Sequence, residues 1–169
     1  MHPICPTEGG LKALRSALGN FVTGVSIVTA TDDSGELCGL TANSFTSVSL
    51  DPPLILVCVS YAARSYTAIT HNGRFAVHIL RDDQTDIARA FAAGGVSRRG
   101  ICPWQVNERG YARLDSYNAG FECRLQQEYW GGDHAILIGQ VECLDVREDG
   151  SSPLVFYRSQ LFGLETSAA

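Results

Sequence analysis

The sequence predicts a mainly β protein, most simply a β-barrel with a few short helices, and three observations support this class. Strand-like apolar segments recur along most of the 169 residues, the helix-like segments are few and short, and no internal repeat or linker divides the chain. A chain of this length is most simply one domain, here residues 1–169. It buries enough surface for a core without disulfide bonds.

The first segments predict an arm, a helix and a strand. Residues 1–10 contain two prolines and two glycines, which predicts a flexible arm. LKALRSAL, residues 11–18, carries leucines at helical spacing and predicts a short amphipathic helix. GVSIVTAT, residues 24–31, predicts a strand, and the turn signal DDSG at 32–35 ends it.

The stretch GLTANSFTSVSLDPPLILVCVS, Gly39 to Ser60, predicts two strands. Asp51-Pro52-Pro53 lies between them, and we expect the prolines to interrupt regular strand pairing there. LILVCV, residues 54–59, is continuously apolar and predicts a strand that is buried on both faces.

Two short helices enclose the next predicted strand. RSYTAITHNG predicts a helix with Ser65 as its N-cap and Gly73 at its end. RFAVHIL, residues 74–80, predicts a strand. TDIARAFAAGG predicts a helix with Thr85 as its cap and Gly94-Gly95 as its terminator.

The rest of the chain predicts an irregular segment followed by strands. Residues 94–110 contain Pro103 and Trp104 and show no regular pattern. From Tyr111 onward, AGFECRLQQEYW, HAILIGQVECLDV and PLVFYR each predict a strand, and the turn signals GGD and REDGSS separate them.

Charge and composition exclude several classes of function. The formal net charge is -5 and the only basic doublet is Arg98-Arg99, which argues against a nucleic-acid-binding protein. The six cysteines form no CxxC pair and the four histidines lack ligand spacing, so we expect free thiols and no metal site. No apolar run is long enough to span a membrane, which favours a cytoplasmic protein.

The first half of the Gly39–Ser60 stretch is polar but carries no charge. Strand alternation places Thr41, Asn43, Phe45, Ser47 and Ser49 on one face. One interpretation is an exposed strand that uses serine and threonine, which sheets tolerate. The other is a wall of neutral donors and acceptors for a ligand rich in carbonyls, ring nitrogens and hydroxyls. The strand by itself favours neither.

A candidate anion site follows the buried strand. Ser60 ends that strand, and Arg64, Ser65 and Thr67 open the next helix, whose N-terminus presents unpaired N–H groups and partial positive charge. The two hydroxyls and the planar Arg64 guanidinium complete a cradle for a phosphate. The alternative is that Ser65 only caps the helix and Arg64 is only a surface residue.

His134, in the segment WGGDH, is the third candidate. A lone histidine beside a turn is more often structural or solvated than functional. The chain has no G-x-S-x-G elbow, no H-E-x-x-H helix and no G-x-G-x-x-G fingerprint, so hydrolytic triads, zinc proteases and a Rossmann dinucleotide site are not indicated.

The order of these segments resembles the flavin reductase family, the small component of two-component flavin monooxygenases. The resemblance covers nearly the whole chain. It runs through FVTGVSIVTA, GLTANSFTSVSLDPPLILVCVS, SYTAI, FAVHIL, the Q-x-x-I-A-x-x-F of Gln84 to Phe91, FEC, GGDHAILIGQV and PLVFYR. It implies a split β-barrel of the FMN-binding, Greek-key type, and a homodimer with flavin sites near the subunit interface.

The resemblance also implies roles for the candidate residues. His134 matches the residue placed near the nicotinamide and the flavin ring. The chain departs from the family pattern in residues 96–116 and at Phe162, where an aromatic hydroxyl often stands. The isoalloxazine and ribityl chain would be lined by Thr41, Ala42, Asn43, Ser44, Ser47, Val48 and Ser49. The phosphate would be held by Ser60, Arg64, Ser65 and Thr67.

The implied activity is hydride transfer from NAD(P)H to the N5 atom of FAD or FMN, with release of reduced flavin to a partner monooxygenase. NADH is the default reductant, although Arg98 and Arg99 are a candidate pair for the 2′-phosphate of NADPH. Two other functions remain open: a non-catalytic flavin carrier or sensor, and a flavin oxidase of a related split barrel.

Overall fold

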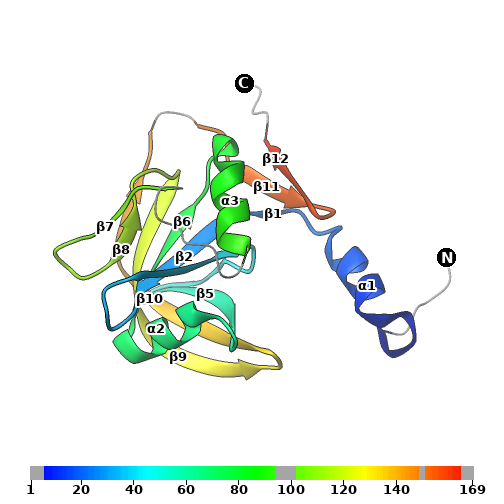
Figure 1. Ribbon diagram of the computed structural model, residues 1–169, viewed down its shortest axis with the longest axis horizontal. Helices are drawn as coiled ribbons and strands as arrows, with labels where there is room; N and C mark the ends of the chain where they lie inside the picture. Colours follow the sequence, from blue (N-terminus) through cyan, green and yellow to red (C-terminus); the bar gives the residue numbers. More distant parts are fainter. Residues whose placement is uncertain (1–5, 94–101, 149–150, 165–169) are drawn as a thin grey trace.

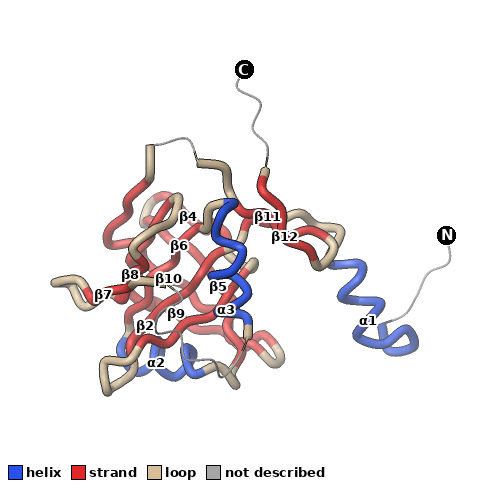
Figure 2. The backbone as a smooth tube through the Cα atoms, turned by 45° about the horizontal axis from the view of Figure 1, so that its top comes forward, coloured by secondary structure: helices blue, strands red, loops and turns tan. Residues whose placement is uncertain are grey.

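A computed structural model describes residues 6–93, 102–148 and 151–164, and it is built mainly from antiparallel strands (Figures 1 and 2). The helical elements are α1 (Pro6–Leu18), α2 (Arg64–Asn72), the 3₁₀ turn η1 (Asp82–Gln84) and α3 (Thr85–Ala92). The strands are β1 (Thr23–Gly24), β2 (Ser26–Thr31), β3 (Leu37–Ala42), β4 (Thr46–Leu50), β5 (Pro53–Ser60), β6 (Arg74–Ile79), β7 (Trp104–Val106), β8 (Ala112–Leu114), β9 (Ala119–Gly131), β10 (His134–Val146), β11 (Leu154–Tyr157) and β12 (Gln160–Gly163).

The main sheet has seven strands in the order β3-β2-β6-β9-β10-β5-β4, so β3 and β4 are its two edges. Only residues 43–45 join these edges, and the gap from Ala42 to Thr46 spans at most about 14 Å. A flat sheet of seven strands would separate its edges by about 29 Å. The sheet therefore has to curl on itself, which agrees with the predicted split barrel.

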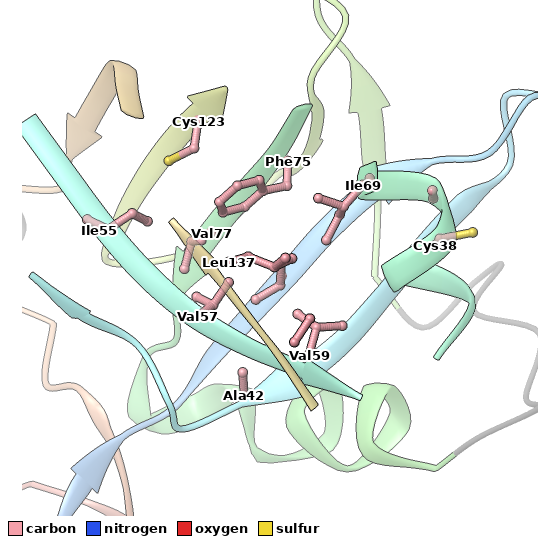
Figure 3. Packing of buried hydrophobic residues seen from close by; sticks show 14 residues of the cluster. Cys38, Ala42, Ile55, Val57, Val59, Ile69, Phe75, Val77, Cys123 and Leu137 are labelled. Atoms are coloured by element: carbon pink, nitrogen blue, oxygen red, sulfur yellow. The ribbon is translucent and has the colours of Figure 1, made fainter. Parts of the chain in front are cut away.

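The inner face of the curled sheet encloses the larger of two apolar clusters. Val57, Val59, Phe75 and Leu137 are nearly inaccessible to solvent there, and Ile69 of α2 closes one side (Figure 3). Gly139 on β10 leaves room for the Phe75 ring, because a Cβ at this position would collide with it.

A second cluster lies where α3 meets the small sheet β1-β11-β12. It contains Val25, Ile27, Leu80, Phe91 and Leu154. Figure 1 shows α3 beside β11 and β12, with α1 extending away from the body of the molecule. The chain's first strand and its last strands thus lie together, because β1 pairs with β11.

Buried ion pairs attach the β7–β8 hairpin to β9. The Glu122 carboxylate is almost fully buried and accepts hydrogen bonds from Asn107 (2.7 Å) and from Arg113 (3.0 Å). Arg109 also pairs with Glu122, at 2.6 Å. Sequence reasoning expected residues 94–110 to be irregular, but the described part of this segment contains β7.

The helix boundaries correct two expected caps and confirm a third. α2 begins at Arg64 with Ala63 as its N-cap residue, so the prediction of Ser65 as N-cap is wrong. Thr85 is the first residue of α3 rather than its cap. Gly73 ends α2 as predicted, with a left-handed φ of 65° and its N–H bonded to the Ile69 carbonyl.

Two further expectations fall at element boundaries, and two others fall outside the described residues. α1 begins at Pro6, so residues 6–10 are helical, with an irregular point at Gly10. Pro53 pairs with Leu50, so the interruption of pairing is limited to Asp51 and Pro52. Gly94-Gly95 and the doublet Arg98-Arg99 lie outside the described residues.

His78 lies near the end of β6, and its ring is hydrogen-bonded to residues on two other strands. Its Nε2 accepts a hydrogen bond from the Leu114 N–H (3.3 Å), and its Nδ1 donates to the Ile27 carbonyl (3.3 Å). The ring is therefore neutral, and burial lowers its pKa to about 4.

The low pKa of His78 predicts a loss of stability in mild acid. Between pH 6.5 and 4 the unfolded chain binds a proton that the folded chain excludes, so the free energy of unfolding falls as the pH falls. The full shift corresponds to about 3 kcal/mol. Urea unfolding at pH 7 and pH 5 measures this loss, and His78→Gln should reduce it. An equal loss in both proteins would contradict the assignment.

Candidate functional site

Residues 43–45 form the crossing between the two edges of the sheet, and their three side chains make contacts in three different places. The Ser44 hydroxyl accepts from the Cys58 N–H (2.9 Å) and donates to the Cys58 carbonyl (3.3 Å), so it joins the crossing to β5. Phe45 packs on the core against Phe121, with ring centroids 5.4 Å apart. Asn43 instead lines a cavity.

The observed crossing corrects the predicted polar face. Strand alternation placed Phe45 beside Asn43 on the ligand side, but the strand is broken between Ala42 and Thr46, so the alternation does not continue through it. Ala42 is buried in the core and can reach a ligand only through its backbone. Ser47, Val48 and Ser49 lie on the exposed edge strand β4, whose register shifts at Val48.

The cavity beside Asn43 has a volume of about 660 Å³ and lies between β3, α3 and the β11–β12 hairpin. Thr41 reaches it from β3, although its hydroxyl donates to the Ala88 carbonyl of α3 (2.6 Å). Sequence reasoning missed the opposite walls. Their only sequence signal was the amphipathic α3 and the polar turn after PLVFYR. They are lined by Val25, Ala88, Arg89, Ala92, Phe156, Ser159, Gln160 and Leu161.

The start of α2 carries a buried hydroxyl that no described group satisfies. Ser65 is 2% exposed, and its Oγ has no hydrogen-bond partner. A buried polar group without a partner is costly, so its presence at a helix N-terminus fits a site that an anion completes. Ser60, four residues before α2, accepts a hydrogen bond from the Ala62 N–H (3.3 Å).

The turn between β2 and β3 holds α2 through three side-chain contacts. Arg64 pairs with Asp32 (2.8 Å), His71 pairs with Asp33 (2.7 Å), and the Asn72 amide donates to the Thr31 carbonyl (2.6 Å). The first two contacts border a small cavity of about 230 Å³ that Thr67 also lines.

Asp32 is itself fixed by the turn that carries it. Its Oδ1 accepts from the Ser34 hydroxyl (2.6 Å) and from the N–H groups of Ser34 and Glu36 (both 3.0 Å). The Ser34 hydrogen bond lowers the pKa of Asp32 below its usual value, and Arg64 adds to the effect. Arg64 is thus already paired, and an anion at α2 would have to share its guanidinium with Asp32.

His134 begins β10 and lies directly opposite Ser60 on β5 and Gly131 on β9. Paired residues of neighbouring strands point to the same face of a sheet, so His134 and Ser60 share the outer face. The His134 Nδ1 lies 2.7 Å from the Asp133 carboxylate, and this contact lowers the pKa of Asp133. Asp133 therefore orients the imidazole.

The predicted site residues thus form two neighbouring groups rather than one enclosed pocket. Thr41 and Asn43 line the larger cavity, whereas Ser60, Arg64, Ser65, Thr67 and His134 gather around the end of β5. In the described residues, no group of three or more histidine, cysteine or acidic side chains is placed to hold a metal ion. No helix among the described residues is both long and apolar enough to cross a membrane.

Comparison with known proteins gives a match over nearly the whole chain. Residues 18–165 match the model of the flavin reductase like domain. A probable flavin reductase of Rhizobium meliloti is 44% identical over 134 residues, which are 79% of this chain and 43% of that protein. The chain thus spans less than half of that relative.

Two further proteins are similar over most of the chain. The stachydrine N-demethylase reductase subunit Stc3 of Rhizobium meliloti is 38% identical over 93% of this chain and 67% of its own length. The NADH:FAD oxidoreductase SgcE6 of Streptomyces globisporus C-1027, solved with NAD and FAD fragments, is 33% identical with a TM-score of 0.90 over both whole chains.

Proposed function

Because the chain belongs to the flavin reductase family, which it matches over residues 18–165, we propose that it catalyses hydride transfer from NADH to FAD or FMN. The main support is that the match over residues 18–165 includes the crossing at residues 43–45, the start of α2 and His134. The sequence resemblance to this family is thereby confirmed, and so is the mainly β fold.

The residues present fit a flavin. The cavity beside Asn43 combines apolar side chains with amides, hydroxyls and the guanidinium of Arg89, which suits an aromatic ring that has a polar edge. The unsatisfied Ser65 hydroxyl and Arg64 suit the flavin phosphate. We assign ring and ribityl contacts to residues 41–44 and 47–49, and phosphate contacts to Ser60, Arg64, Ser65 and Thr67.

The flavin supplies the electron-accepting chemistry, and the side chains of this protein bind and orient it. Hydrogen-bond donors near the ring can stabilise charge that develops on it, and Arg89 adds a positive charge to the same cavity. His134, held by Asp133, positions the nicotinamide. Holding the reacting atoms about 3–3.5 Å apart is the main contribution expected from such a site.

We extend the proposal to the assembly and setting of the protein. It forms a homodimer, because the outer face that carries His134 also presents the half-buried Leu56, Cys58, Ile136 and Ile138, and an isologous partner would cover them. It works as one domain in the cytoplasm, where reducing conditions suit the five free cysteines of the described chain. Its reduced flavin passes to a partner monooxygenase; the relative Stc3 is likewise a reductase subunit, in its case of a stachydrine N-demethylase.

The decisive experiment is a turnover assay with purified protein, NADH or NADPH, and excess free FAD or FMN. We expect many turnovers of added flavin, followed as loss of the nicotinamide absorbance, with NADH preferred. Flavin binding without NADH oxidation would instead support the carrier or sensor. A tightly retained flavin that reacts only with another reductant would support the oxidase.

His134→Ala should lower turnover with NADH by about tenfold while leaving flavin affinity nearly unchanged, because the side chain positions the nicotinamide rather than the flavin. Steady-state kinetics give the turnover, and a fluorescence titration gives the affinity. Unchanged kinetics would remove His134 from the site.

Arg64→Ala should weaken binding of FMN and FAD by about 1.5 kcal/mol, roughly tenfold, through loss of a charge-assisted hydrogen bond to phosphate. Riboflavin, which lacks the phosphate, is the matched control and should bind both proteins equally. If Arg64→Ala weakens riboflavin and FMN by the same factor, the arginine does not hold the phosphate.

A further inference from the structure

We propose that Ser159 and Gln160, at the tip of the β11–β12 hairpin, position the ring bound in the cavity beside Asn43. They would do so by hydrogen bonding to an imide or carboxamide edge of that ring. The inference rests on the proposed function and adds one wall to the proposed site. This wall lies on the last strands of the described chain, far in sequence from the segments that carry the predicted site residues.

The hairpin turn has an unusual backbone. Tyr157 pairs with Gln160, so Arg158 and Ser159 form a two-residue turn. Their φ angles are 47° and 64°, and they are the only non-glycine residues with positive φ in the described chain. Two-residue turns of this left-handed kind favour asparagine and glycine, because other side chains crowd the backbone there.

Arg158 holds this turn in place. Its backbone N–H donates to the Gly19 carbonyl (2.8 Å), and its guanidinium donates to the Asn20 side-chain oxygen at 3.0 and 2.9 Å. The guanidinium also lies over the Tyr157 ring, 5.1 Å from its centroid. The contacts that fix the turn therefore belong to Arg158, and Ser159 contributes none of them.

Ser159 and Gln160 line the cavity instead. Figures 1 and 2 show β11 and β12 beside α3, and the cavity between them has Asn43 in its opposite wall. Within the described chain, the side chains of Asn43, Ser159 and Gln160 make no hydrogen bond to the protein. Thr41, by contrast, already uses its hydroxyl on α3.

The side chains that line the cavity indicate which chemical group of a ligand they would bind. An amide offers a donor and an acceptor side by side, which matches an imide edge or a carboxamide. Val25, Phe156 and Leu161 give the same cavity an apolar surface suited to a ring. The flavin pyrimidine edge and the nicotinamide carboxamide share this chemistry, so either ring fits the proposed contacts.

Backbone strain supports a functional role for Ser159. At a φ of 64° glycine would be the unstrained choice, and serine is retained at a cost in stability. Residues held in such conformations concentrate at binding sites, where the surrounding structure keeps them in place. Ser159 lines the cavity, and its hydroxyl is available to a ligand there.

The test uses Ser159→Gly, Gln160→Ala and, as matched control, Gln126→Ala, which removes an amide on β9 that does not line the cavity. Each protein is titrated with FMN and with FAD, assayed for the KM and kcat of NADH at saturating flavin, and melted to obtain Tm. We expect Ser159→Gly and Gln160→Ala to raise the flavin Kd or the NADH KM about three- to tenfold. The control should match the unmodified protein in both constants.

The melting temperature separates positioning from a structural role. Ser159→Gly relieves the left-handed strain, so we expect its Tm to rise while its binding weakens. A residue that only supported the fold would change stability and binding in the same direction. Gln160→Ala should weaken binding with Tm unchanged, and it serves as the second test if the turn variant alters the hairpin.

The outcomes distinguish the two rings and the two proposals. A rise in flavin Kd alone assigns the contact to the flavin edge, and a rise in NADH KM alone assigns it to the carboxamide. No change in either constant for both variants overturns the inference. The flavin titration needs no turnover, so an unmodified protein that binds flavin but does not oxidise NADH contradicts the proposed function alone. Failure to bind flavin at all overturns both.

Discussion

The short crossing between the two edge strands is the constraint on which the rest of the structure depends. β3 and β4 are the outermost strands of a seven-stranded sheet, yet only residues 43–45 connect them. The sheet has to curl until its edges come close, and the curl produces the enclosed core and the seam where Ser44 bonds to Cys58. One short connection thus sets the shape of the barrel and the position of its polar groups.

This constraint also explains why the stretch is polar but uncharged. At the seam the backbone leaves the strand ladder, so a hydroxyl has to replace ladder hydrogen bonds, and Ser44 does so. Phe45 turns inward to close the core, and Asn43 turns to the cavity. A charged side chain among these three would be buried in the core or would crowd the cavity. The polarity therefore serves the barrel as much as a ligand.

Local patterns in the sequence predicted most strands, the end of α2 at Gly73 and the family. They failed where the outcome depends on distant residues. Alternation placed Phe45 on the ligand face because it assumes an unbroken strand. The preference of serine for N-caps suggested Ser65 as the cap, but packing buries that residue one position inside the helix. The α3 and hairpin walls were missed because only tertiary pairing brings residues 88 and 159 to residue 43.

The pairing of β1 with β11 has a consequence for how the protein is made. Strands β2 to β5 can form hairpins as soon as they leave the ribosome, because their partners are close in sequence. The wall formed by Ser159 and Gln160 requires residues 154–163, which are synthesised after all the strands of the main sheet. A nascent chain can therefore assemble much of its barrel before the hairpin that forms one wall of the cavity has been synthesised.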